Sequence, residues 1–105
     1  MKKLVIIGAG ESGIGASILA KKEGFDVFVS DFGNIPVEQK NELNDLGIAF
    51  EEGKHSMNLI LSADEIVKSP GVPDTVPAII KAKENGISVI SEIEFASRYT
   101  DAEII

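Results

Sequence analysis

The feature that most constrains the fold is a regular alternation of two kinds of segment along the 105 residues. Short runs rich in apolar, β-branched residues alternate with longer segments of helical character, and glycines at 24, 47 and 86 close three of the longer segments. The expected strands are 4–7, 27–30, 48–50, 65–68 and 88–90; the expected helices are 12–23, 37–46, 56–62, 76–85 and 91–99. This alternation predicts right-handed βαβ units, and hence a doubly wound parallel α/β sheet of about five strands with flanking helices.

The loop after the first expected strand, GAGESG, has the glycine spacing of Rossmann-like nucleotide-binding domains. Gly8 permits a tight turn, Gly10 lets the backbone approach a ligand, and Gly13 lets the helix pack closely. The N-terminus of that helix offers unpaired N–H groups and a partial positive charge, which suit a phosphate, and Ser12 adds a hydroxyl. Glu11 would repel a diphosphate, so its side chain is expected to face solvent. The alternative is that the glycines only make a tight strand-to-helix turn.

Two further loops follow the carboxyl ends of expected strands, where ligands bind in open parallel sheets. Asp31 ends the second strand, 18 residues after Gly13. Its carboxylate could accept hydrogen bonds from ribose hydroxyls or from the ring N–H of a uracil, or it could only cap the following turn. The loop Ser69–Pro73 reads SPGVP and is stiffened by two prolines. It is either part of the same site or a rigid connection.

Composition excludes several other kinds of site. Seventeen acidic against ten basic residues give a net charge of −7, which argues against binding to nucleic acid or to an anionic membrane. The chain has no cysteine and a single histidine, so thiolate and multi-histidine metal sites are excluded. No apolar run approaches the ~18 residues that span a bilayer, and a cytoplasmic location is expected. His55 is interpreted as a solvated loop residue, and Glu92 and Glu94 as first-turn acids, Glu94 completing a capping box with Ser91.

The final residues, 101–105, become apolar again after the last expected helix. They are interpreted as the start of another strand. The expected organisation is therefore one domain over residues 1–100, with 101–105 leading into a further domain that this sequence does not contain.

Four stretches together resemble the N-terminal domain of the Mur ligases: GAGESG, the strand-end Asp31, SPGVP at 69–73 and ISEIEF at 90–95. GAGESG alone is common, whereas SPGVP and SEIEF in this order are typical of the branch that adds D-glutamate. The resemblance covers essentially the whole chain. It implies that the domain holds the UDP part of UDP-N-acetylmuramoyl-L-alanine in a monomeric enzyme of peptidoglycan synthesis.

The resemblance also implies a role for particular positions. The backbone of Gly10–Gly13, with the Ser12 hydroxyl, would contact the diphosphate. Asp31 would accept the uracil N–H, the Phe32 backbone N–H could meet a uracil carbonyl, and Ser69–Gly71 (Ser69, Pro70, Gly71) would lie beside the nucleoside. Some relatives carry a stacking arginine where this chain has Gly33, and Phe32 could replace that contact.

In the intact family protein, ATP and Mg²⁺ activate the alanyl carboxylate as an acyl-phosphate, which the amine of D-glutamate then attacks. This chain contains no G-x-x-x-x-G-K-[ST] loop for ATP. No catalytic or metal-binding residue is therefore assigned, and the 105 residues alone are expected not to catalyse the reaction. Three other readings stay open: an NAD(P)-binding domain of a dehydrogenase, a nucleotide-sensing regulatory module, and an interaction domain without a ligand.

Overall fold

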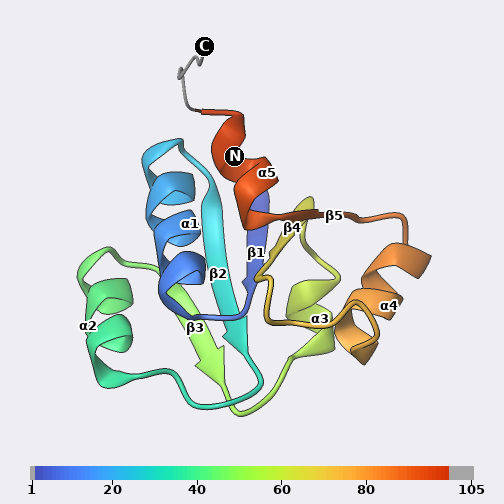
Figure 1. Cartoon of the computed structure of the whole chain (residues 1–105), viewed down its shortest axis with the longest axis horizontal. Helices are drawn as coiled ribbons and strands as arrows, with labels where there is room; N and C mark the ends of the chain where they lie inside the picture. The colour runs from blue at the N-terminus through green and yellow to red at the C-terminus, as the bar shows by residue number, and fades with distance from the viewer. Residues whose placement is uncertain (1, 100–105) are drawn as a thin grey trace.

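The computed structural model describes residues 2–99, with the backbone alone for Ser12. Five parallel strands form one sheet in the order β3-β2-β1-β4-β5 (Figure 1). The strands are β1 (Lys3–Ile7), β2 (Asp26–Asp31), β3 (Ala49–Glu52), β4 (Glu65–Lys68) and β5 (Ser88–Ser91). The first strand of the chain is thus the middle strand of the sheet, paired with β2 on one side and β4 on the other.

Helices cover both faces of the sheet (Figure 1). The helices are α1 (Glu11–Lys22), α2 (Val37–Asp45), α3 (Met57–Ile60), α4 (Pro77–Glu84) and α5 (Glu92–Ser97). Side chains of α1, α2 and α5 pack on one face, against Leu4 and Ile6 of β1. Those of α3 and α4 pack on the other face, against Val5 and Ile7. Burial on both faces explains why β1 is continuously apolar and does not alternate.

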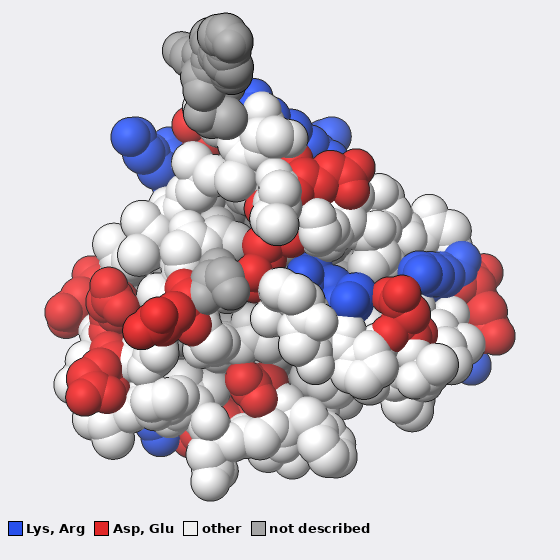
Figure 2. Space-filling view, viewed as in Figure 1, with Lys and Arg blue, Asp and Glu red and all other residues white. Residues whose placement is uncertain are grey.

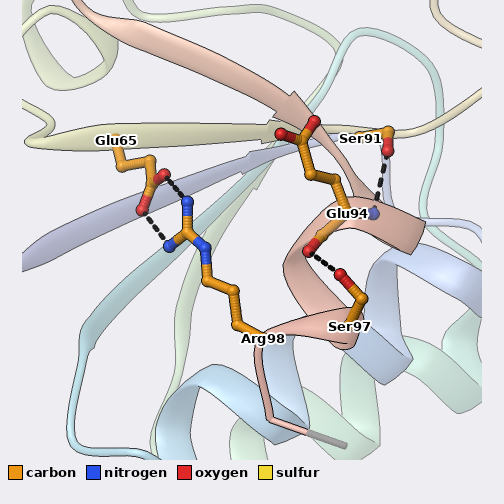
Figure 3. Close-up of polar contacts among 5 residues, drawn as sticks. All are labelled: Glu65, Ser91, Glu94, Ser97 and Arg98. Carbon is orange, nitrogen blue, oxygen red and sulfur yellow. Dashed lines mark hydrogen bonds and ion pairs between the residues drawn. The ribbon is translucent and has the colours of Figure 1, made fainter.

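The ends of the elements follow local sequence signals. The glycines at 24, 47 and 86 have positive φ, as expected for residues just past a helix. Pro77 occupies the first turn of α4, where its missing N–H costs nothing. The Ser91 side chain caps α5 by accepting a hydrogen bond from the Glu94 N–H at 3.0 Å (Figure 3). The predicted α/β fold is confirmed, with each expected strand and helix present.

Charge is unevenly distributed on the face seen in Figure 2. Acidic side chains gather over α2 and the first turn of α1, where Glu11, Glu38 and Glu42 line one groove. Two lysines, Lys68 and Lys83, lie 3.6 and 4.0 Å from the carboxylate of Asp74. Over residues 2–99, no helix has the length and apolar character needed to cross a membrane. The interpretation of residues 101–105 concerns a segment outside the described residues.

Candidate functional site

A cavity of about 570 Å³ lies at the carboxyl edge of the sheet, where the loops that follow β1, β2 and β4 meet. Gly8, Ala9 and Gly10 line it from the first loop, Asp31 and Phe32 from the second, and Ser69 and Gly71–Pro73 from the third; His55, Met57 and 76–78 complete it. The chain leaves β1 towards β2 on one side and returns as β4 on the other. The cavity therefore occupies the topological switch point, the usual ligand site in open parallel sheets.

The three glycines of the first loop do different things. Gly8 has φ +100°, and a Cβ added there would lie 2.7 Å from Cβ of Ser69, so the first and third loops touch at this residue. A Cβ on Gly13 would lie 2.0 Å from the carbonyl oxygen of Gly8, so α1 packs directly on the turn. A Cβ on Gly10 would meet nothing within 4 Å, which leaves its backbone open to the cavity. The tight turn predicted at Gly8 and the close packing predicted at Gly13 are confirmed, whereas the approach of a ligand to Gly10 stays a prediction.

The first turn of α1 provides backbone donors at the edge of the cavity. Gly10 is the N-cap residue without a side-chain cap, and the first helical bond runs from the Ile14 N–H to the Gly10 carbonyl. The backbone N–H groups of residues 11–13 come before this bond and have no acceptor within the helix, so they suit an anion. Glu11 is exposed and lies outside the cavity, in the groove towards α2. The expectation that its side chain faces solvent is therefore confirmed.

Asp31 joins the first two loops and also shapes its own turn. Its Oδ2 accepts the Ala9 N–H and its Oδ1 accepts the Gly33 N–H, both at 2.8 Å. The capping role left open by the sequence is thus real. Because each carboxylate oxygen has two acceptor sites, Asp31 can still accept a further hydrogen bond from a ligand in the cavity it lines.

The third loop is fixed from both ends. The Ser69 N–H donates to the Ile7 carbonyl, and the Val72 N–H donates back to the Ser69 carbonyl, both at 3.0 Å. Lys68 Nζ donates to the Val72 carbonyl at 2.6 Å and lies 3.6 Å from the Asp74 carboxylate. Sequence reasoning missed this use of Lys68. Pro70 is exposed and lies outside the cavity lining, so it stiffens the turn and does not form the wall.

The interpretation of His55 as a solvated loop residue is wrong. It is half-buried, lines the cavity, and places Nδ1 2.7 Å from Oγ of the fully buried Ser30. Its ring centroid is 5.7 Å from that of Phe32. Burial lowers the pKa of His55 from 6.5, although the negative charges of Glu51 and Asp31 act in the opposite direction. Its place in the cavity could have been inferred from its position just past the third strand, at the same edge of the sheet as the three loops.

Glu92 lies in the first turn of α5, as expected, but it is buried, with 6% of its surface exposed. One carboxylate oxygen would be 3.5 Å from a Cβ on Gly13, so this side chain lies against the glycine loop. Sequence alone did not distinguish it from the exposed Glu94 two residues later. Within residues 2–99, no group of three or more histidine or acidic side chains is arranged to hold a metal ion.

Of the nine positions expected to contact a ligand, the structure brings five together around the cavity: Gly10, Asp31, Phe32, Ser69 and Gly71. Ser12 and Gly13 belong to the first turn of α1 behind Gly10. Gly33, which stands where a stacking arginine was considered, donates its N–H to the Asp31 carboxylate. The neighbouring Phe32 is 71% exposed. Phe32 is therefore free to contact a ligand.

The strand order and the position of the cavity define a Rossmann-like α/β domain. An imine reductase variant from Myxococcus stipitatus in complex with NAD⁺ shares this fold, with a TM-score of 0.60 and 16% identity over 87% of this chain and 40% of that chain. Residues 2–91 match the family model for the N-terminal domain of MurD-like Mur ligases, and the chain belongs to this family. The family assignment, unlike the fold, separates the chain from the dehydrogenases.

Individual relatives agree with the family. The UDP-N-acetylmuramoylalanine–D-glutamate ligase of Bacteroides fragilis is 57% identical over 105 residues, which is 100% of this chain and 24% of that protein. The solved UDP-N-acetylmuramate:L-alanyl-γ-D-glutamyl-meso-diaminopimelate ligase from Neisseria meningitides has a TM-score of 0.81 and 26% identity over 95% of this chain and 31% of that one. The chain thus spans about a quarter of the length of the curated relative.

Proposed function

We propose that this domain binds the UDP end of UDP-N-acetylmuramoyl-L-alanine for a cytoplasmic, ATP-dependent ligase that adds D-glutamate during peptidoglycan synthesis. The observation that carries the proposal is the cavity at the switch point, which combines an open glycine backbone, a carboxylate acceptor and the Ser-Pro-Gly turn. The name of the Bacteroides fragilis relative supplies the substrate and the amino acid added. Residues 1–100 would form the nucleotide-binding domain of that enzyme, and 101–105 would lead towards its ATP-binding part.

The two ends of the cavity suit the two ends of a nucleoside diphosphate. The first turn of α1, beside Gly10, supplies backbone N–H groups for the diphosphate. Val72, Pro73 and Met57 provide apolar surface for the base. Asp31, at the end of β2 and on the other side of β1 from the loop that carries Val72 and Pro73, supplies an acceptor that a uracil N–H or a ribose hydroxyl would match.

The ligase chemistry would be supplied by residues beyond this chain. ATP and Mg²⁺ would form the acyl-phosphate and D-glutamate would attack it, in domains that the 105 residues do not contain. The present domain would then orient the substrate by binding its nucleotide end, which is remote from the reacting carboxylate. Binding energy from such a remote group can be used to position the reacting carboxylate.

The proposal is tested by NMR titration of the ¹⁵N-labelled chain with UDP, with UDP-N-acetylmuramoyl-L-alanine and with NAD. Shifts confined to residues 10–13, 31 and 71 with both uridine ligands, and not with NAD, are the expected result. Shifts with NAD alone would overturn the proposal and favour a dinucleotide-binding domain. Ligase turnover by the purified chain would contradict the assignment of catalysis to other domains.

A pair of variants tests whether the glycine loop is the phosphate end. Gly10→Ala adds a methyl group that meets no protein atom within 4 Å, so it should fold normally yet obstruct a ligand at the backbone. UDP binding is expected to weaken about tenfold, equivalent to about 1.4 kcal/mol. Gly15→Ala, one turn further along α1 and equally free of contacts, is the matched control and should bind UDP like the parent chain. Equal affinities for the two variants would place the diphosphate elsewhere.

A further inference from the structure

Among the described residues that line the cavity, His55 carries the one imidazole, and the proposed function gives it no role. Behind the wall, its Nδ1 meets the hydroxyl of Ser30, a residue of β2 with 0% of its surface exposed. Phe32 packs beside the imidazole with the ring planes inclined by 41°. The histidine is therefore held in place on two sides, which is more than a loop residue at a solvated surface requires.

The hydrogen-bond partners of Ser30 decide which ring nitrogen carries the proton. Ser30 Oγ lies 2.8 Å from Oε2 of Glu51 and 3.3 Å from the Lys54 carbonyl, and both of these groups can only accept. The single hydroxyl proton must go to one of them. The bond between Ser30 Oγ and His55 Nδ1 then needs its proton from the ring, so Nδ1 is the donor.

The charge state of Glu51 supports this assignment. Burial acts to raise its pKa, but hydrogen bonds from the backbone and hydroxyl of Ser56, and from Ser30, outweigh burial and lower the pKa below 4.5. Glu51 is thus an ionised acceptor at neutral pH. Burial keeps His55 neutral at the same pH, against the opposing pull of Glu51 and Asp31. A neutral ring protonated at Nδ1 has its lone pair on Nε2.

We infer that His55 is a specificity-determining residue of the nucleotide cavity, whose Nε2 accepts a hydrogen bond from a donor group of the bound nucleoside. The donor is a ribose hydroxyl or the imide N–H of the base. The inference rests on the proposed function and deepens it. It also fits the rest of the wall, because the described residues that line the cavity include the acceptor Asp31 and no lysine or arginine. The nucleoside would be selected through the donors that it presents.

The direct test is the side-chain ¹⁵N spectrum of the 105-residue chain, in which His55 is the only histidine. In the free protein, Nδ1 should show the shift of a protonated nitrogen and Nε2 that of an unprotonated one. Saturating UDP should move the Nε2 signal towards the protonated value, as acceptance of a hydrogen bond requires. A proton on Nε2 in the free protein, or an Nε2 signal unmoved by bound UDP, would overturn the inference.

Two substitutions measure the contribution to affinity. His55→Asn can keep the bond to Ser30 but places no group at the position of Nε2, and should weaken UDP binding about 3- to 10-fold. His55→Gln can reach the Nε2 position with an amide oxygen and should recover much of that loss. If UDP binds the parent chain and His55→Asn equally well, the inference fails while the proposed function stands. If the parent chain does not bind UDP, both fail.

Ligand analogues identify the donor. The loss caused by His55→Asn should disappear with 2′-deoxy-UDP or with 3′-deoxy-UDP if that ribose hydroxyl is the partner, and with N3-methyl-UDP if the imide N–H is the partner. An undiminished loss with all three analogues would show that His55 acts on the shape of the cavity and not as an acceptor, and would contradict the inference.

Discussion

At the scale of single residues, the glycine loop requires glycine more because there is no room for a Cβ than because the backbone must be flexible. Gly8 combines a positive φ with the contact to Ser69, while Gly13 has an ordinary helical conformation and no room for a side chain. The two therefore exclude other residues for different physical reasons. Gly15, two positions further along the same helix, meets neither constraint.

This difference predicts opposite effects of the same substitution. Gly13→Ala forces a methyl group against the Gly8 carbonyl and should lower the free energy of unfolding by about 3 kcal/mol or more. Gly15→Ala should raise it by about 0.5–1 kcal/mol, because alanine is the better helix former and nothing obstructs it. Urea unfolding followed by circular dichroism measures both values. Similar unfolding midpoints for the two variants would contradict the close packing of α1 on the turn.

At the scale of elements, α5 shows how a short helix is kept in place. It has six residues, too few to be stable alone. The Ser91 cap fixes its start, and the ring of Phe95 packs edge-on against Phe25 in the core. Just past its end, Arg98 reaches back to the Glu65 carboxylate of β4 through two hydrogen bonds (Figure 3). Tertiary contacts therefore provide the stability of α5 that its intrinsic helix propensity does not provide.

The Arg98–Glu65 pair should contribute measurably because both terminal guanidinium nitrogens are engaged and the Glu65 side chain is only 13% exposed. A double-mutant cycle with Arg98→Ala and Glu65→Ala is expected to give a coupling free energy of about 0.5–1 kcal/mol that decreases with added salt. The more exposed Lys83–Asp74 pair, 4.0 Å apart, is the control and should give a value near zero. Equal coupling in the two cycles would show that Arg98 does not hold α5.

Most elements were predictable because their signals are local. Apolar runs, closing glycines, Pro77 and the S-x-x-E cap each act within a few residues, and the observed boundaries lie close to those expected. The helix expected over 56–62 is the main difference, since α3 spans only Met57–Ile60. Its end tightens into i→i+3 bonds, from Ser62 to Leu59 and from Ala63 to Ile60, which sequence periodicity does not reveal.

At the scale of the whole molecule, the site was only partly predictable. Loops that follow parallel strands meet at one edge, so the three loops were expected to converge, and they do. The role of His55 depends on partners brought together by the sheet register, in which Ser30 of β2 lies opposite Glu51 of β3. No local pattern encodes that register. A buried Glu92 beside Gly13 likewise follows from the packing of α5 on α1 and not from the sequence around it.

The same network makes stability depend on pH in two separate windows. Because the pKa of His55 is lower in the folded state than 6.5, the unfolded chain binds more protons there, and stability present above pH 6.5 is lost as pH falls through the folded pKa. The lowered pKa of Glu51 adds stability above pH 4.5 that is lost below it. Urea midpoints measured from pH 8 to pH 3 should therefore fall in two stages.

His55→Gln should remove the first stage and leave the second, since the chain has no other histidine. An unchanged decline between pH 7 and pH 5 in this variant would show that another group titrates in that range and would contradict the assignment.

The position of β1 also has a consequence for synthesis on the ribosome. Within this sheet, β1 is synthesised well before its second neighbour, β4, which begins at Glu65. At about 5–20 residues per second, one edge of the most apolar strand stays open for several seconds. During that interval the nascent chain exposes unpaired backbone groups beside a hydrophobic surface, the combination that recruits chaperones or promotes aggregation.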